Sequence, residues 1–147
     1  MTTKQAFTPT EWEQVLTGPP SAGMMVVTAQ RGGTFRETIS MGKAYAEARQ
    51  RHGESELLDE IVAAKPQVDH TRYHSAEELN EHALAHLRDA VALLDAKATP
   101  QETADYKRFV VDLVERVASA HREGGHAQDP VSDAERSAIE SIRAALG

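Results

Sequence analysis

Cysteine is absent from the 147 residues of this chain. This excludes disulfide bonds, thiolate zinc sites, iron–sulfur clusters and cysteine nucleophiles. Long apolar runs are missing too: the longest, residues 22–27, is far shorter than the roughly 20 residues of a membrane-spanning helix. The N-terminal residues 1–5 lack the charged-then-apolar layout of a signal peptide. We therefore expect a soluble, cytoplasmic protein without a membrane partner.

Positive charge is also scarce, with 16 Lys and Arg residues against 23 Asp and Glu residues and a formal net charge of −7. A nucleic-acid partner requires a basic face that displaces counterions, and no basic block is present. The sequence has no phosphate loop, dinucleotide fingerprint or nucleophile elbow. We therefore expect neither nucleic-acid binding nor an enzyme, although an enzyme of unidentified chemistry remains the third alternative.

Helix-capping residues are plentiful. In a capping box, Ser or Thr at the N-cap and Glu three residues later each satisfy a backbone N–H of the first helical turn. Five such pairs occur in the chain: Thr8 with Glu11, Thr34 with Glu37, Ser75 with Glu78, Thr99 with Glu102, and Ser132 with Glu135. Each precedes a helical apolar pattern, and no run alternates as a strand would. The sequence predicts an all-α fold.

Apolar residues at helical spacing predict a compact bundle of about six to seven helices. The predicted segments are 9–16, 21–30, 35–52, 56–64, 76–97, 100–123 and 133–146. The first should stop at Gly18-Pro19-Pro20, and the second is apolar nearly all round, which predicts the centre of the core. On the third, Phe35, Ile39, Gly42 and Ala46 should share a face. We expect a single domain over residues 1–147.

Two parts of the chain share one layout. Residues 26–33 and 117–125 both run from a helix of small residues into a Gly-Gly break, and a capped helix follows each. Isoleucine stands at the same place after each capping box, at Ile39 and Ile139. Two such helix-turn-helix units can pack as a pseudo-twofold pair. Chance is the alternative, because Gly-Gly breaks and capping boxes are common.

The second of these units resembles the tellurite-resistance TerB-like helical domains. The similar residues are Ala118-Ser119-Ala120, Glu123-Gly124, Val131–Glu135 and Ile142–Gly147, and the first unit matches more loosely over residues 22–46. The resemblance implies an all-α bundle with a stress-associated, divalent-cation-binding role, its ligands being acidic residues near the two turns. The first turn departs from that pattern, because it reads Gln30-Arg31-Gly32.

The glycine-rich turn after residue 123 is the first candidate metal site. Glu123, His126, Asp129 and Asp133 place three carboxylates and an imidazole within eleven residues. Carboxylate oxygens suit Ca²⁺, Mg²⁺ or Mn²⁺, although the spacing is not that of an EF-hand loop. The alternative is a solvated turn in which Asp133 favours the start of the next helix electrostatically.

A histidine pair is the second candidate. His82 and His86 are four residues apart in the predicted helix 76–97, so both point to one side, and Glu78 continues the row. Such a pair can hold Zn²⁺ when a third ligand arrives from elsewhere. The alternative places His86 at the edge of the buried stripe formed by Leu79, Ala83, Leu87, Ala90 and Leu94.

Three functions follow as hypotheses. The first is a non-enzymatic, TerB-like helical module that binds a divalent cation. The second is an interaction protein that buries a helical face against a partner or another copy of itself. The third is the enzyme of unidentified chemistry.

Overall fold

The structure is a computed structural model that describes residues 4–29, 34–50, 56–63, 76–123 and 133–147. These residues form a short 3-10 helix, Lys4–Ala6, and six α-helices, and they contain no strand. The α-helices are α1 (Pro9–Ala29), α2 (Thr34–Gln50), α3 (Glu56–Ala63), α4 (Ala76–Lys97), α5 (Pro100–Glu123) and α6 (Asp133–Leu146). The all-α prediction is confirmed. Within these ranges, no helix combines the length and apolarity needed to cross a membrane.

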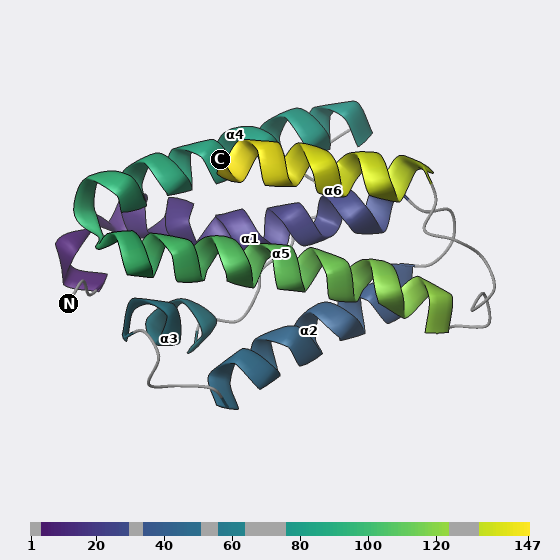
Figure 1. The fold of residues 1–147 in the computed structure, drawn as a ribbon, viewed down its shortest axis with the longest axis horizontal. Helices are drawn as coiled ribbons and strands as arrows, with labels where there is room; N and C mark the ends of the chain where they lie inside the picture. Colours follow the sequence, from purple (N-terminus) through teal and green to yellow (C-terminus); the bar gives the residue numbers. More distant parts are fainter. Residues whose placement is uncertain (1–3, 30–33, 51–55, 64–75, 124–132) are drawn as a thin grey trace.

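Helix α1 lies at the centre of the bundle and contacts α2, α4, α5 and α6. Figure 1 shows α4 and α6 on one side of α1 and α5, and α2 and α3 on the other. The prediction that residues 21–30 form the core centre is confirmed where side chains are described. Ala22, Met24, Met25 and Val26 are all buried.

The predicted buried stripe of α4 is also confirmed. Leu79, Ala83, Leu87, Ala90 and Leu94 are all at most 8% exposed, and α1 is the most extensive neighbour of α4. Helix α5 buries the predicted Tyr106, Val110, Leu113 and Val117, whereas the side chain of Ala120 lies outside the described residues. Helical periodicity alone was sufficient for these faces, because each helix buries a single stripe.

The predicted helix stop at Gly18-Pro19-Pro20 was wrong, because α1 continues through both prolines. Pro19 has no N–H to donate to the carbonyl of Val15 four residues earlier. The Tyr106 hydroxyl of α5 donates to that carbonyl instead, at 2.8 Å. A side chain from another helix therefore replaces the missing bond, and the apolar residues on both sides of the prolines stay buried in one helix.

Gly18 makes room for this hydroxyl. A Cβ atom at residue 18 would lie only 2.4 Å from the Tyr106 hydroxyl oxygen, closer than real Cβ contacts come. Burial raises the pKa of Tyr106 well above its ordinary value, so the hydroxyl keeps the proton that it donates to Val15. Gly18, Pro19 and Tyr106 thus form one structural unit.

The face predicted for α2 is exposed where its residues are described. Gly42 and Ala46 are exposed, whereas Ala44 and Tyr45 are buried. The side chains of Phe35 and Ile39 lie outside the described residues. The Tyr45 ring packs edge-on against Phe109 of α5, with centroids 5.2 Å apart. Burying a large aromatic ring stabilises more than burying a small residue, and this orients α2.

Two of the predicted capping boxes are confirmed. The Thr8 N–H donates to the Glu11 carboxylate at 2.9 Å, and the Glu11 N–H donates to the Thr8 hydroxyl at 3.2 Å. Thr99 and Glu102 exchange the same two bonds at 3.0 and 3.1 Å. The other three boxes each include a residue whose side chain lies outside the described part of the chain.

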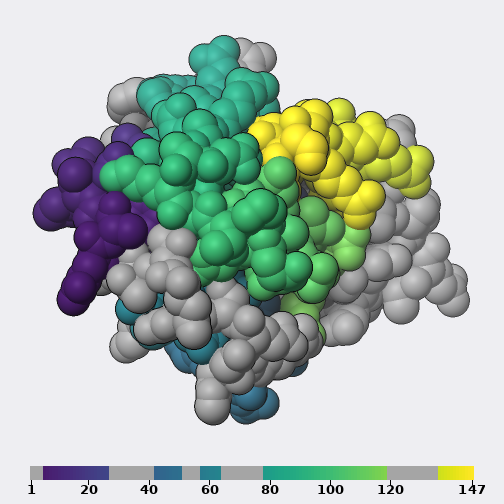
Figure 2. Space-filling view, turned by 60° about the vertical axis from the view of Figure 1, so that its left-hand side comes forward, coloured from purple at the N-terminus to yellow at the C-terminus, as the bar shows by residue number. Residues whose placement is uncertain are grey.

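Lys97 ties the N-terminal residues to the end of α4. Its Nζ donates to the Glu11 carboxylate at 2.6 Å and to the Ala6 carbonyl at 3.2 Å, and it lies 5.7 Å from the centroid of the Phe7 ring. The hydrogen bond from Lys97 lowers the pKa of the Glu11 carboxyl. Figure 2 shows the N-terminal residues beside the joint between α4 and α5. We assign this cluster a structural role.

Candidate functional site

The predicted metal site in the turn between α5 and α6 lies largely outside the described residues. Glu123 ends α5 and Asp133 begins α6, but their side chains, like all of His126 and Asp129, are not described. This site stays a prediction. So does the internal repeat, because the glycines of both predicted turns, at 32–33 and 124–125, also lie outside the described ranges.

The predicted histidine pair lies on α4. The rings of His82 and His86 are on one side of the helix, with centroids 6.5 Å apart. His82 is exposed and His86 half-buried, so the boundary position predicted for His86 is confirmed. Within the described part of the chain, no three His, Asp or Glu residues are arranged to hold a metal ion. A zinc site here lacks a third ligand among those residues.

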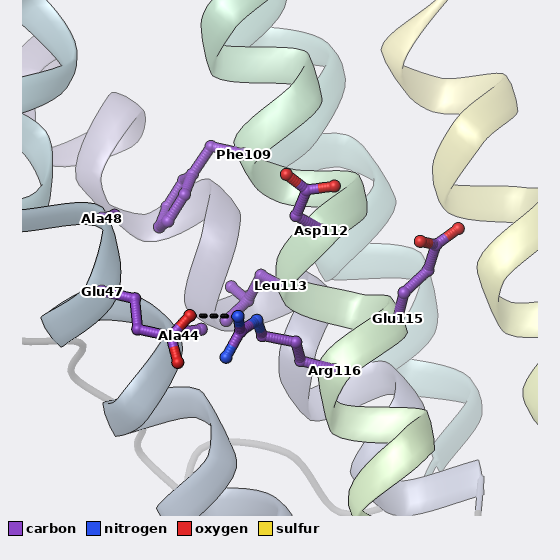
Figure 3. A pocket seen from close by; sticks show the side chains of 8 residues that line it. All are labelled: Ala44, Glu47, Ala48, Phe109, Asp112, Leu113, Glu115 and Arg116. Atoms are coloured by element: carbon purple, nitrogen blue, oxygen red, sulfur yellow. Dashed lines mark ion pairs between the residues drawn. The ribbon is translucent and has the colours of Figure 1, made fainter. Parts of the chain in front are cut away.

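A cleft of about 410 Å³ lies between α2 and α5, and its lining was not predicted from the sequence. Its floor is apolar and its rim is charged (Figure 3). The floor residues are Ala44 and Ala48 of α2 with Phe109 and Leu113 of α5, and the rim residues are Glu47, Asp112, Glu115 and Arg116.

The cleft exists because small and large residues face each other across the two helices. Ala44 and Ala48 stand one turn apart on α2, so they line the same part of its surface. Each presents only a methyl group to α5. Phe109 and Leu113 are buried below them, and Phe109 is held edge-on by Tyr45. The helices therefore meet closely at the aromatic pair and leave space beside it.

An ion pair spans the cleft. The Arg116 guanidinium of α5 points across to the Glu47 carboxylate of α2 (Figure 3). Their side chains are 40% and 43% exposed, and ion pairs this exposed contribute only about 0–1 kcal/mol to folding. The pair therefore links α2 and α5 across the cleft without being essential to the fold.

The rim carries more negative than positive charge. Its carboxylates are Glu47, Asp112 and Glu115, and its single cation is Arg116. Glu115 also pairs with Arg143 of α6. Asp112 is exposed and has no ion-pair partner among the residues that the structure describes. The rim can accept a further positive charge.

The chemistry of the lining suits contact with a ligand. None of its eight residues carries a hydroxyl or an imidazole, so it offers no nucleophile of the serine type and no histidine base. It offers carboxylate oxygens, one guanidinium and a small apolar surface.

Two sequence signals accompany these residues. Alanines four apart on α2 and a charged Asp112–Arg116 row beside Phe109 and Leu113 both appear in the sequence. Neither signal is specific, because charged rows are usual on helix surfaces. The contact between α2 and α5, which joins the two rows, is a tertiary feature.

Comparison with known proteins adds no relative: no family model matches the chain, and searches of curated proteins and of solved structures find no match.

Proposed function

We propose that the chain is a non-enzymatic helical module that binds a positively charged peptide segment in the cleft between α2 and α5. The observation that supports this proposal is a cleft with an apolar floor and a rim of three carboxylates, of which Asp112 has no ion-pair partner among the described residues. Pockets of about 300–1,000 Å³ hold small ligands or a few side chains, and a cleft of 410 Å³ falls in that range.

Charge supplies a large share of the binding energy. Leu113, Phe109 and Ala44 are at most 7% exposed, so a ligand covers little additional apolar area. The net charge of −7 steers positively charged partners toward the surface and accelerates their association. We expect a weak, rapidly exchanging complex, with a Kd on the order of 10–1,000 μM, that weakens as salt is added.

A peptide titration followed by NMR tests this proposal. The arginine probe is a short acetylated and amidated peptide of leucine, alanine and arginine with its leucines on one helical face. The glutamate probe carries glutamate in place of arginine. We expect the arginine probe to shift the backbone amide signals of residues 44–48 and 109–116, and the glutamate probe to shift none of them.

A matched pair of variants locates the binding. Ala48→Leu fills the cleft with a larger side chain, whereas Ala46→Leu places the same side chain on the exposed face of α2. We expect A48L to weaken binding at least about tenfold and A46L to leave it unchanged. Equal affinities of the two variants, or no shifts with the arginine probe, contradict the proposal.

A further inference from the structure

The cleft already holds a guanidinium group, that of Arg116. This group points from α5 toward Glu47, and both residues line the cleft together with Leu113 of the floor (Figure 3). It is therefore paired with a carboxylate in a cleft with an apolar floor, as a ligand's arginine in the same cleft would be.

We infer that the cleft recognises an arginine side chain, and that Arg116 holds the guanidinium position on Glu47 until the ligand's arginine replaces it. This inference rests on the proposed function and names the group that is bound.

The exchange requires little energy. Arg116 and Glu47 are 40% and 43% exposed, so water can hydrate both groups as the pair opens. Asp112 stands four residues before Arg116 on α5, a spacing at which a carboxylate and a guanidinium on one helix can pair. The displaced Arg116 can therefore pair with Asp112 while Glu47 accepts the incoming arginine, and no charge is left uncompensated.

The chemistry favours arginine over lysine. A guanidinium is planar and donates two parallel hydrogen bonds to a carboxylate, and it is more weakly hydrated than an ammonium group. The position beside Glu47 is occupied by a guanidinium and so has a suitable size for one. We expect the arginine probe to bind about threefold or more tightly than a lysine probe of otherwise identical sequence.

Two glutamine variants separate exchange from general electrostatics. Arg116→Gln and Arg143→Gln each remove one positive charge and break an exposed ion pair of a rim carboxylate, that of Glu47 in the first variant and that of Glu115 in the second. Because no Arg116 guanidinium competes for Glu47 in R116Q, this variant should bind the arginine probe about two- to fivefold more tightly than R143Q does. Both ion pairs are exposed, so both variants should fold, which their helical circular dichroism checks.

A third variant tests the choice of ligand group. Glu47→Gln removes the carboxylate that pairs with the guanidinium, so we expect the arginine and lysine probes to bind this variant with equal affinity.

The outcomes distinguish this inference from the proposed function. An equal gain in R116Q and R143Q shows that Glu47 is not a special acceptor in the cleft, and a loss in R116Q shows that Arg116 itself contacts the ligand. Either result overturns the inference while the cleft remains a binding site. Absence of cleft binding by the wild-type chain overturns the proposed function and the inference with it.

Discussion

Helix α5 forms two contacts of opposite character. Toward α1 it places the buried Tyr106 ring, and the Tyr106 hydroxyl donates to a backbone carbonyl of α1. Toward α2 it meets two alanines across a cleft and holds Glu47 through an exposed ion pair. We call the first the α1 contact and the second the α2 contact.

The difference separates stability from recognition. Burial and a fully used hydroxyl make the α1 contact intolerant of change at two positions. A side chain at residue 18 would clash with the Tyr106 hydroxyl, and loss of that hydroxyl would leave the Val15 carbonyl unsatisfied. The α2 contact tolerates change at its rim, because exposed charges contribute little to folding. A surface of that kind can gain a ligand without loss of the fold.

The largest effect should follow from Gly18→Ala at the α1 contact. The added Cβ would lie 2.4 Å from the Tyr106 hydroxyl oxygen. Overpacking and the strained hydrogen bond together should lower the free energy of unfolding by about 3 kcal/mol, measured by urea denaturation.

Gly42→Ala is the control for this variant. A Cβ there meets nothing within 4 Å, on the exposed side of α2. The alanine should raise the free energy of unfolding by about 0.5–1 kcal/mol through helix propensity. Similar losses of stability in both variants contradict the close packing assigned to Gly18.

The next largest effect should come from alkaline pH, which should lower the free energy of unfolding. Burial raises the pKa values of Tyr45 and Tyr106 above the ordinary 10.0, so above pH 10 these tyrosines ionise in the unfolded chain before the folded one. The folded state then binds more protons, and stability falls as pH rises. For two tyrosines the free energy of unfolding should drop by about 2 kcal/mol between pH 10 and pH 11. Tyr45→Phe should halve the drop, and an undiminished drop contradicts this assignment.

Tyr106→Phe should have a somewhat smaller effect. It leaves the Val15 carbonyl without the hydroxyl that replaces the Pro19 N–H, and it should destabilise the chain by about 1–2 kcal/mol. In a Pro19→Ala background the backbone N–H returns and the same substitution should cost about 1 kcal/mol less. A double-mutant cycle measures this coupling, and additive effects contradict the assigned replacement.

The smallest effect on stability should come from the α2 contact. Glu47→Gln breaks the ion pair with Arg116 and should change the free energy of unfolding by less than about 1 kcal/mol. A thermal melt checks this, and a loss as large as that of G18A removes the distinction between the two contacts.

Local chemistry explains what was predicted from the sequence. The stripe of α4 and the boxes at Thr8 and Thr99 depend on residues three or four apart, which a helix brings together by itself. The path of α1 through Pro19 depends on Tyr106, which lies 91 residues after its acceptor Val15. The residues around Pro19 therefore did not indicate this hydrogen bond, because its donor is far away in the sequence.

The cleft could not be predicted for the same reason, since its residues are distant in the sequence. Its lining comes from α2 and α5, and each row alone resembles an ordinary helix surface. The sequence drew attention instead to the glycine-rich turn with Glu123 and to the pair of His82 and His86, where titratable residues are close together along the chain. The cleft arises from the packing of α2 against α5, and not from the composition of either helix.

The binding proposed for the cleft depends on local carboxylates at the α2 contact, and not on net charge. Its most direct test compares the affinity of the arginine probe for two double variants with equal loss of charge. Glu47→Gln with Asp112→Asn alters the rim, and Asp89→Asn with Asp95→Asn alters exposed positions on α4, which does not line the cleft. We predict that the rim variant binds at least about tenfold more weakly than the wild-type chain and the α4 variant less than about twofold more weakly. Equal weakening of both would contradict the account.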